Sequence, residues 1–140
     1  MFKYVASKEI KIELEDSQYK QISSVYNINN TLSRNKAFAF DILLNKDVIG
    51  FAMLRKYDAG CYFLWDYAID YKYQNKHYGT NALRELIEFL KKKYKAVEIS
   101  TTYIWGNEIA SHVYQNVGFR ITDVIDDGDI NEVNMMLKIQ

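Results

Sequence analysis

The sequence predicts a single α/β (α+β) domain, spanning residues 1–140, in which antiparallel and parallel strands share one sheet. Three segments rich in aromatic and β-branched residues, at 37–44, 48–57 and 62–69, are separated only by short polar turns, which indicates an antiparallel meander. A segment with helical periodicity then precedes another apolar run at 96–103. A strand, a helix and a strand in this order form a parallel crossover unit.

The segment between the two parallel strands has the pattern of an amphipathic helix. Its apolar residues recur three and four positions apart, which places them on one stripe. We read the lysines that follow, at 91–93 and 95, as a solvated last turn that complements the helix dipole rather than as a nucleic-acid patch. The stripe consists of Ala82, Leu83, Leu86, Ile87, Leu90 and Tyr94.

The first 35 residues carry weaker signals. Residues 2–6 favour a strand, and Ile10, Ile12 and Leu14 alternate like one, although the Glu and Lys residues between them suit a helix as well. We expect a short strand followed by a helix, because later apolar residues have helical spacing. Those residues are Tyr19, Ile22, Val25 and Tyr26.

The end of the chain predicts a short helix and a hairpin. Residues 107–116 form the helix, and Gly118 is placed to cap its end. The strand-like segments 119–125 and 132–137 flank an acidic turn that contains a glycine, which favours a hairpin. We expect the buried side of the helix to carry Ile109, Ala110, Val113 and Val117.

Composition limits the classes of function. Acidic and basic residues balance at 18 each, so no global field draws the chain to nucleic acid or to an anionic membrane, and charge-based recognition must be local. A single cysteine, Cys61, cannot form an internal disulfide, and no apolar run approaches the length of a membrane span. We therefore expect a cytoplasmic protein. Cys61 and His112 lack partners at metal-ligand spacing, so no metal is expected.

The start of the long helix lacks the acidic residues that helix N-termini usually carry in their first turn. Residues 75–81 contain none, and Lys76 and His77 add positive or switchable charge. A bound phosphate would supply the missing anion. The alternative is that water satisfies these amides and the loop is only a connector.

Two motifs carry a resemblance to a known family. Residues 74–79, Gln-Asn-Lys-His-Tyr-Gly, resemble the Gln/Arg-x-x-Gly-x-Gly/Ala pyrophosphate loop of the GNAT superfamily of acetyl-CoA-dependent N-acetyltransferases. Residues 107–119 resemble its Asn-x-x-Ala-x-x-Leu-Tyr-x-x-x-Gly-Phe segment. Residues 64–74, and Gly-Phe-Ala-Met at 50–53, are similar to bacterial polyamine and diamine (spermine/spermidine) acetyltransferases. Two positions differ: His77 replaces the first glycine of the loop, and Asp66 stands where that group often has arginine.

The resemblance implies a fold and a reaction. The fold would be a mixed sheet of six or seven strands flanked by three to four helices. The reaction would transfer the acetyl group of acetyl-CoA to a primary amine, with a small-molecule polyamine or diamine as the favoured acceptor. A protein amine or an aminoglycoside is the alternative acceptor, and a non-catalytic coenzyme A binding domain is the alternative function. Dimers are common in the superfamily, so a homodimer is possible.

The resemblance also assigns site residues. Tyr114 would be the general acid that protonates the coenzyme A sulfur, and its ordinary pKa near 10 keeps it protonated at neutral pH. Backbone N–H groups of 65–69 would meet the acetyl carbonyl and pantetheine, and the neighbouring parallel strand would splay away. The cofactor-binding set would be Ala68, Ile69, Gln74, Asn75, Lys76, His77, Tyr78, Gly79, Thr80, Asn107 and Tyr114.

The base and the acceptor pocket are less determined. Asp66 and Glu98 are candidate bases, with water as an alternative, and either carboxylate could instead lie on a solvent face. Tyr62, Asp66 and Tyr67 are candidates for binding a cationic amine. Because neighbours on a strand point to opposite faces, Asp66 and Tyr67 cannot both line one pocket. Asn107 also suits a plain helix N-cap.

Overall fold

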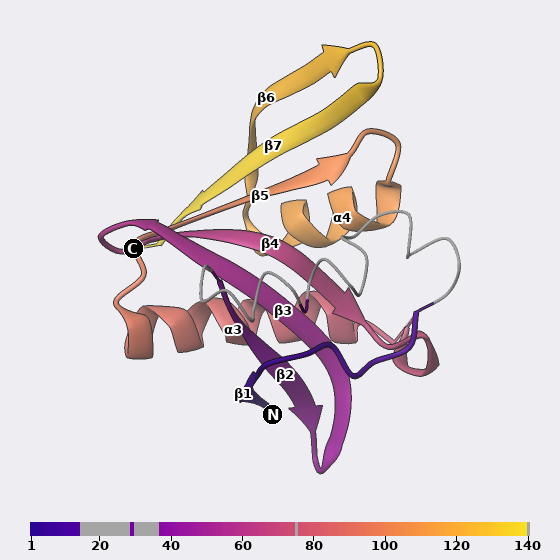
Figure 1. Cartoon of the computed structure of the whole chain (residues 1–140), viewed down its shortest axis with the longest axis vertical. Coiled ribbons are helices and arrows are strands. Elements are labelled where there is room, and N and C mark those ends of the chain that lie inside the picture. Colours follow the sequence, from indigo (N-terminus) through magenta and orange to yellow (C-terminus); the bar gives the residue numbers. More distant parts are fainter. Residues whose placement is uncertain (15–28, 30–36, 75, 140) are drawn as a thin grey trace.

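A seven-stranded mixed sheet organises the chain (Figure 1). The computed structural model describes residues 1–14, 29, 37–74 and 76–139. The strand order is β1-β2-β3-β4-β5-β7-β6, and every neighbouring pair is antiparallel except β4 and β5. This confirms the predicted mixed sheet with a meander and one parallel crossover. The strands are β1 (Phe2–Ser7), β2 (Phe38–Leu44), β3 (Asp47–Asp58), β4 (Cys61–Ile69), β5 (Glu98–Ile104), β6 (Arg120–Asp127) and β7 (Ile130–Lys138).

Two α-helices, α3 (Tyr78–Tyr94) and α4 (Glu108–Val117), and a 3-10 turn, η1 (Tyr71–Tyr73), accompany the sheet within the described residues. This is slightly fewer helices than the three to four expected, and the helix expected around 19–26 lies outside those residues. The predicted stripe of α3 is buried against the sheet from Ala82 to Leu90. Residues 10–14 form no regular element, although Ile12 and Leu14 are buried.

The buried side of α4 differs from the expectation at one residue. Ile109 is 77% exposed, and Tyr114 is the buried residue of this helix. Ala110, Val113, Tyr114 and Val117 form a stripe spaced three and four residues apart that packs on the core, and Ile109 falls outside it. Asn107 caps the start of the helix, and Gly118, with φ of 114°, caps its end as predicted.

The sheet carries a core on each face. The larger cluster lies between the sheet and the two helices and includes Leu64 and Leu90, whereas a smaller one on the other face includes Phe51, Met53 and Ala68 with Ile12 from the N-terminal segment. Both faces of the sheet are therefore covered by apolar side chains.

A β-bulge in β4 changes the face to which its residues point. Met53 of β3 pairs with Asp66, but the next residue, Leu54, pairs with Leu64, so Trp65 is an extra residue. Before the bulge Leu64 faces the helices, and after it Tyr67 does so. Asp66 and its strand neighbour Ala68 therefore face the opposite side.

Candidate active site

The parallel strands β4 and β5 separate halfway along their length. Their register runs from Cys61↔Glu98 to Leu64↔Thr101, the last pair found among the described residues, whereas β4 continues to Ile69 and β5 to Ile104. Figure 1 shows the two strands diverging, with α4 near their separated ends. The divergence begins next to the bulge at Trp65, which is the local irregularity expected to bend a strand. It leaves a gap between the two strand backbones beside residues 65–69, called the opening from here on, where the resemblance implied that the strands would splay.

Tyr114 reaches this opening from α4. The side chain is 7% exposed and packs against the ring of Phe119 at a centroid distance of 5.4 Å. Burial raises the pKa of Tyr114 to about 12; a side-chain hydrogen bond with Thr101 lowers it and the charge of Asp66 raises it. The phenol is therefore fully protonated at neutral pH and can act as a proton donor.

Asp66 approaches the same opening from the other face of the sheet. Its side chain is only 5% exposed, so the alternative of a carboxylate on a solvent face does not apply to this residue. The effect of its charge on the pKa of Tyr114 shows that the two groups are close enough to interact. A buried carboxylate, from the face of β4 opposite the helices, therefore lies within electrostatic range of a buried phenol carried by α4.

Thr101 completes the cluster, and no sequence motif pointed to this residue. Its side chain is 1% exposed, and its hydroxyl Oγ1 donates to the Leu64 carbonyl oxygen at 2.9 Å. This bond closes the last rung of the parallel pair and places the hydroxyl beside Tyr114. Its position at the last pair of the β4–β5 ladder depends on the register between the two strands. The apolar periodicity within each strand does not predict that register.

The loop between β4 and α3 holds the residues of the predicted pyrophosphate motif. His77 is the N-cap of α3 with a left-handed backbone, φ of 63°, and its side chain makes no capping hydrogen bond. The first turn of α3 contains no acidic residue, and Lys76 and His77 are exposed. Gln74 Nε2 donates to the Ile69 carbonyl oxygen at 2.9 Å, which fixes the start of the loop against β4. Asn75 lies outside the described residues.

The first turn of α3 is anchored on β4 and on aromatic rings. Tyr67 Oη donates to the Gly79 carbonyl oxygen at 2.5 Å, and a Cβ added to Gly79 would meet Ile69 at an ordinary 3.7 Å. Tyr78 contacts the rings of Phe2 and Tyr73. Thr80 is half-buried in the same turn.

Three of the residues predicted for the site have other surroundings. Tyr62 is 4% exposed and donates to the Tyr94 carbonyl oxygen at 3.1 Å, in the core under α3, and Tyr67 also faces α3. Glu98 accepts a 2.6 Å hydrogen bond from Tyr57 Oη and pairs with Cys61 at the far end of the parallel ladder. It precedes Thr101 by three residues, roughly 10 Å along a strand. We assign the two tyrosines to packing.

The remaining predicted residues border the opening or cap a helix. Ala68 and Ile69 are each 7% exposed on the diverging part of β4. Asn107 Oδ1 accepts a hydrogen bond of 3.1 Å from the Ala110 N–H, the N-cap that its residue type favoured. The cap fixes the direction of α4, which in turn carries Tyr114.

Comparison with known proteins decides the family. The model of the Acetyltransferase (GNAT) family matches residues 7–119. The chain belongs to the GNAT family of acetyltransferases. This membership confirms the resemblance noted in the two sequence motifs. Among curated proteins, the spermine/spermidine N(1)-acetyltransferase of Bacillus subtilis (strain 168) is 33% identical over 87 residues. The match spans 57% of this chain and 57% of that relative.

Solved GNAT structures share the fold over nearly the whole chain. A GNAT acetyltransferase from Elizabethkingia anophelis, with acetyl-CoA bound, has a TM-score of 0.73 at 17% identity and covers 99% of this chain and 98% of its own. Aminoglycoside acetyltransferase AAC(6')-Ib in complex with coenzyme A has a TM-score of 0.74 at 16% identity, covering 97% and 95%. At these identities the likeness establishes the fold.

The described residues meet the requirements of neither a metal site nor a membrane-spanning helix. Within the described residues, no three His, Cys, Asp or Glu side chains lie close enough together to hold a metal ion. None of the helices in that part of the chain has the length and apolarity needed to cross a membrane.

Proposed function

We propose that this GNAT protein transfers the acetyl group of acetyl-CoA to a primary amine of a small cationic acceptor, with a polyamine or diamine as the favoured substrate. The observation that carries the proposal is the divergence of β4 and β5 beyond Leu64 and Thr101, next to the buried phenol of Tyr114 and the buried carboxylate of Asp66, whose charge acts on that phenol. An acid for the leaving group and an anion for the amine are two of the groups that this reaction needs.

The residues around the opening fit acetyl-CoA. The exposed Lys76 and His77, next to a helix start without acidic residues, offer positive charge and backbone N–H groups to a pyrophosphate. The edge of β4 from 65 to 69, which β5 leaves, can meet the pantetheine arm, and Asn107 stands at the start of α4. When bound, acetyl-CoA supplies an activated acetyl group and a thiolate leaving group.

Tyr114 is the proposed general acid. Its Oη retains its proton because burial disfavours the phenolate. The proton can then pass from Oη to the departing sulfur as the amide bond forms. In this proposal, backbone N–H groups of 65–69 on the edge of β4 that β5 leaves would stabilise negative charge on the acetyl oxygen, and one such donor is worth about 3 kcal/mol in other enzymes.

Asp66 is the proposed anchor and base for the amine. An ammonium group that enters from the second face of the sheet meets a carboxylate of low exposure, where electrostatic attraction is stronger than in water. The same carboxylate can accept the proton that the ammonium must lose, directly or through water. Glu98 has no part in this proposal, because it is bonded to Tyr57 at the other end of the ladder.

A panel of amines tests the proposed activity. The protein is incubated with acetyl-CoA and with spermidine, 1,4-diaminobutane, kanamycin or a lysine peptide, and thiol release is followed together with the mass of the product. We expect turnover with the first two to exceed turnover with the others. Preference for kanamycin or the peptide would move the acceptor to the alternative class. Tight acetyl-CoA binding without turnover on any amine would favour a non-catalytic binding domain.

A further inference from the structure

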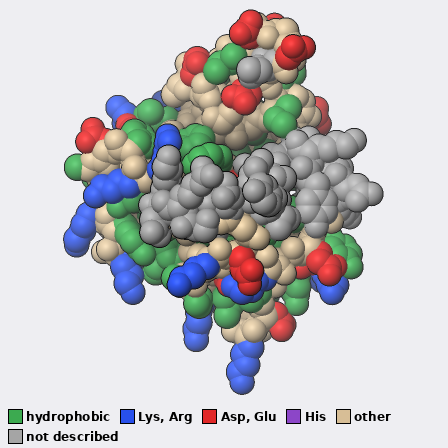
Figure 2. Space-filling model, viewed as in Figure 1, with side chains coloured by type: hydrophobic (Ala, Val, Ile, Leu, Met, Phe, Trp, Pro, Cys, Tyr) green, Lys and Arg blue, Asp and Glu red, His purple; other side chains and the backbone are tan. Residues whose placement is uncertain are grey.

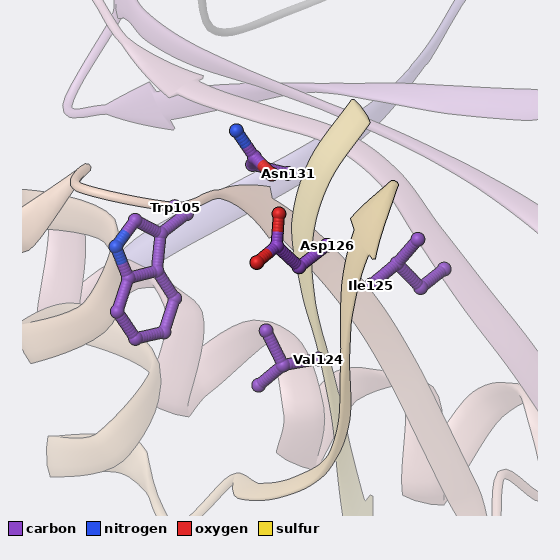
Figure 3. A pocket seen from close by; sticks show the side chains of 5 residues that line it. All are labelled: Trp105, Val124, Ile125, Asp126 and Asn131. Atoms are coloured by element: carbon purple, nitrogen blue, oxygen red, sulfur yellow. The ribbon is translucent and has the colours of Figure 1, made fainter. Parts of the chain in front are cut away.

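A second concave site lies between Trp105 and the β6–β7 hairpin, and its lining contains neither Asp66 nor Tyr114. The pocket has a volume of about 310 Å³ and is lined by Trp105, Val124, Ile125, Asp126 and Asn131. Figure 3 shows the Asp126 carboxylate pointing toward the side of the strand where the Trp105 indole lies, with Val124 on the same side. The pocket therefore combines an aromatic face, a carboxylate and an aliphatic wall.

The hairpin register and one backbone hydrogen bond form this pocket. The Trp105 N–H donates to the Asn131 carbonyl oxygen at 2.9 Å, which ties the turn after β5 to β7. Asp126 pairs with Asn131 across the hairpin, and Val124 pairs with Val133, so these four side chains belong to one face of the hairpin. The Trp105 indole itself is 62% exposed.

The hairpin also concentrates negative charge in a chain that is neutral overall. Residues 121–137 contain five acidic residues and no Lys or Arg, whereas the whole chain has 18 of each sign. Figure 2 shows the acidic side chains on the projecting hairpin end of the molecule. The field at this end favours cations. The five residues are Asp123, Asp126, Asp127, Asp129 and Glu132.

We propose that this pocket binds the ammonium group of an alkylamine, with the cation between the Trp105 ring and the Asp126 carboxylate and the alkyl chain along Val124. An indole face attracts an ammonium through its quadrupole, and a neighbouring carboxylate adds Coulomb attraction. An organic cation fits this lining better than a metal ion, because the described residues offer no cluster of three metal ligands. Val124 and Ile125, which also line the pocket, have no atoms that could coordinate a metal ion.

This pocket is separate from the acceptor side of the proposed active site. Val124 pairs with Val133, which is buried in the core on the helix face of the sheet, whereas Asp66 points to the opposite face. The pocket therefore does not depend on the proposed acetyl transfer and can be tested without acetyl-CoA. An amine bound here would occupy a site in addition to the reacting one.

Nitrogen-edited NMR of the tryptophan indole N–H signals provides the test. The full chain is titrated with spermidine, then with 1-aminobutane and 1-butanol, in the absence of acetyl-CoA, and the Trp105 signal is assigned by its loss in Trp105→Leu. We expect a saturable shift of that signal with both amines and none with the alcohol. An equal shift with 1-butanol would show an apolar contact only and would overturn the proposal.

Two aspartates give a matched pair for the carboxylate. We expect Asp126→Asn to raise the Kd for spermidine about fivefold, the upper range for an exposed ion pair. Asp127→Asn removes the same charge from the same hairpin but from outside the pocket, and should change the Kd less than twofold. Equal effects of both variants would mean diffuse attraction by the hairpin and would contradict the proposed site. Trp105→Leu should weaken binding about two- to fivefold, and unchanged affinity in that variant would also contradict it.

Discussion

Tyr114 holds the proton that the proposed reaction needs, and its surroundings keep that proton in place. Burial raises the pKa of this phenol from 10.0 to about 12, because the phenolate would lose its hydration. The corresponding stabilisation of the fold is present below pH 10, where the unfolded tyrosine is also protonated, and is lost as the pH rises through about 12. The acid should therefore remain functional across the range in which an alkylamine deprotonates.

This property predicts the shape of the pH–rate profile. With 1,4-diaminobutane as acceptor, we expect kcat/KM to rise between about pH 7 and pH 9, because the deprotonated fraction of an amine with a pKa near 10 grows over this range. No decline caused by Tyr114 should occur below about pH 10. Melting curves at each pH control for unfolding. A fall in rate centred near pH 8.5 in the folded protein would mean that the acid has a pKa below the ordinary value of 10.0 and would contradict this expectation.

Some residues of the candidate site could be predicted from sequence motifs, and others could not. The motif around Tyr114 selected that residue from twelve tyrosines, and the structure places it at the opening. Thr101 and the extra residue Trp65 could not be selected, because both depend on strand register: a helix rather than a tight turn joins β4 to β5, and the β3–β4 pair contains a bulge. Tyr62 and Tyr67 were expected near the acceptor because a strand pattern alone does not reveal on which side a helix will pack.

At the scale of elements, the turn that leads into α3 combines a left-handed backbone with a side chain. Residues other than glycine lose roughly 1–2 kcal/mol in this conformation, and His77 adopts it with φ of 63°. The family motif has glycine at this position. The histidine therefore sits where a side chain can crowd phosphates, although its exposed imidazole can also add positive charge.

The variant His77→Gly separates these effects. We expect it to preserve or tighten acetyl-CoA binding in calorimetry, because glycine adopts positive φ without strain and leaves room for the pyrophosphate. His77→Ala is the control, since it removes the imidazole but keeps a Cβ on the left-handed backbone. Marked loss of affinity in both variants would show that the imidazole itself holds the phosphates.

Most elements could be predicted because their periodicity is local. The meander, α3, β5 and the final hairpin lie within a few residues of the predicted ranges, and the stripe of α3 is buried as its spacing indicated. The face of α4 was harder to predict because a helix of 10 residues allows two overlapping apolar stripes, and the one containing Tyr114 is buried. The N-terminal residues 10–14 pack by long-range contacts rather than by a repeating pattern.

At the scale of the whole molecule, the N-terminal segment is fastened across the second face of the sheet. Lys11 Nζ forms a 2.6 Å ion pair with Asp41 Oδ2 of β2, whose carboxylate is 7% exposed. The Glu13 N–H donates to Asp70 Oδ2 at 3.1 Å, and Ile12 joins the smaller core cluster. These contacts join residues 10–14 to β2, to Asp70 directly after β4, and to the core cluster that contains Ala68 of β4, so they cover the face of the sheet to which Asp66 points.

Breaking the ion pair should destabilise the fold. Lys11→Met leaves the Asp41 carboxylate buried without its cation, and we expect a loss of about 2 kcal/mol in the free energy of unfolding, measured by urea denaturation. Lys8→Met is the matched control, because Lys8 is exposed and forms no ion pair within the described residues. Equal stability of the two variants would show that Lys11 does not fasten the segment.

The comparison of Tyr114→Phe with the unaltered protein tests the proposed mechanism most directly. Turnover with 1,4-diaminobutane and the Kd for acetyl-CoA are measured on both, with Tyr62→Phe as a control that removes a buried hydroxyl from the core under α3. We expect Tyr114→Phe to lower kcat by about 100-fold or more, the usual contribution of a general acid, and to leave the Kd within about twofold. Unchanged kcat, or a loss of kcat that Tyr62→Phe reproduces, would contradict the assignment of Tyr114 as the acid.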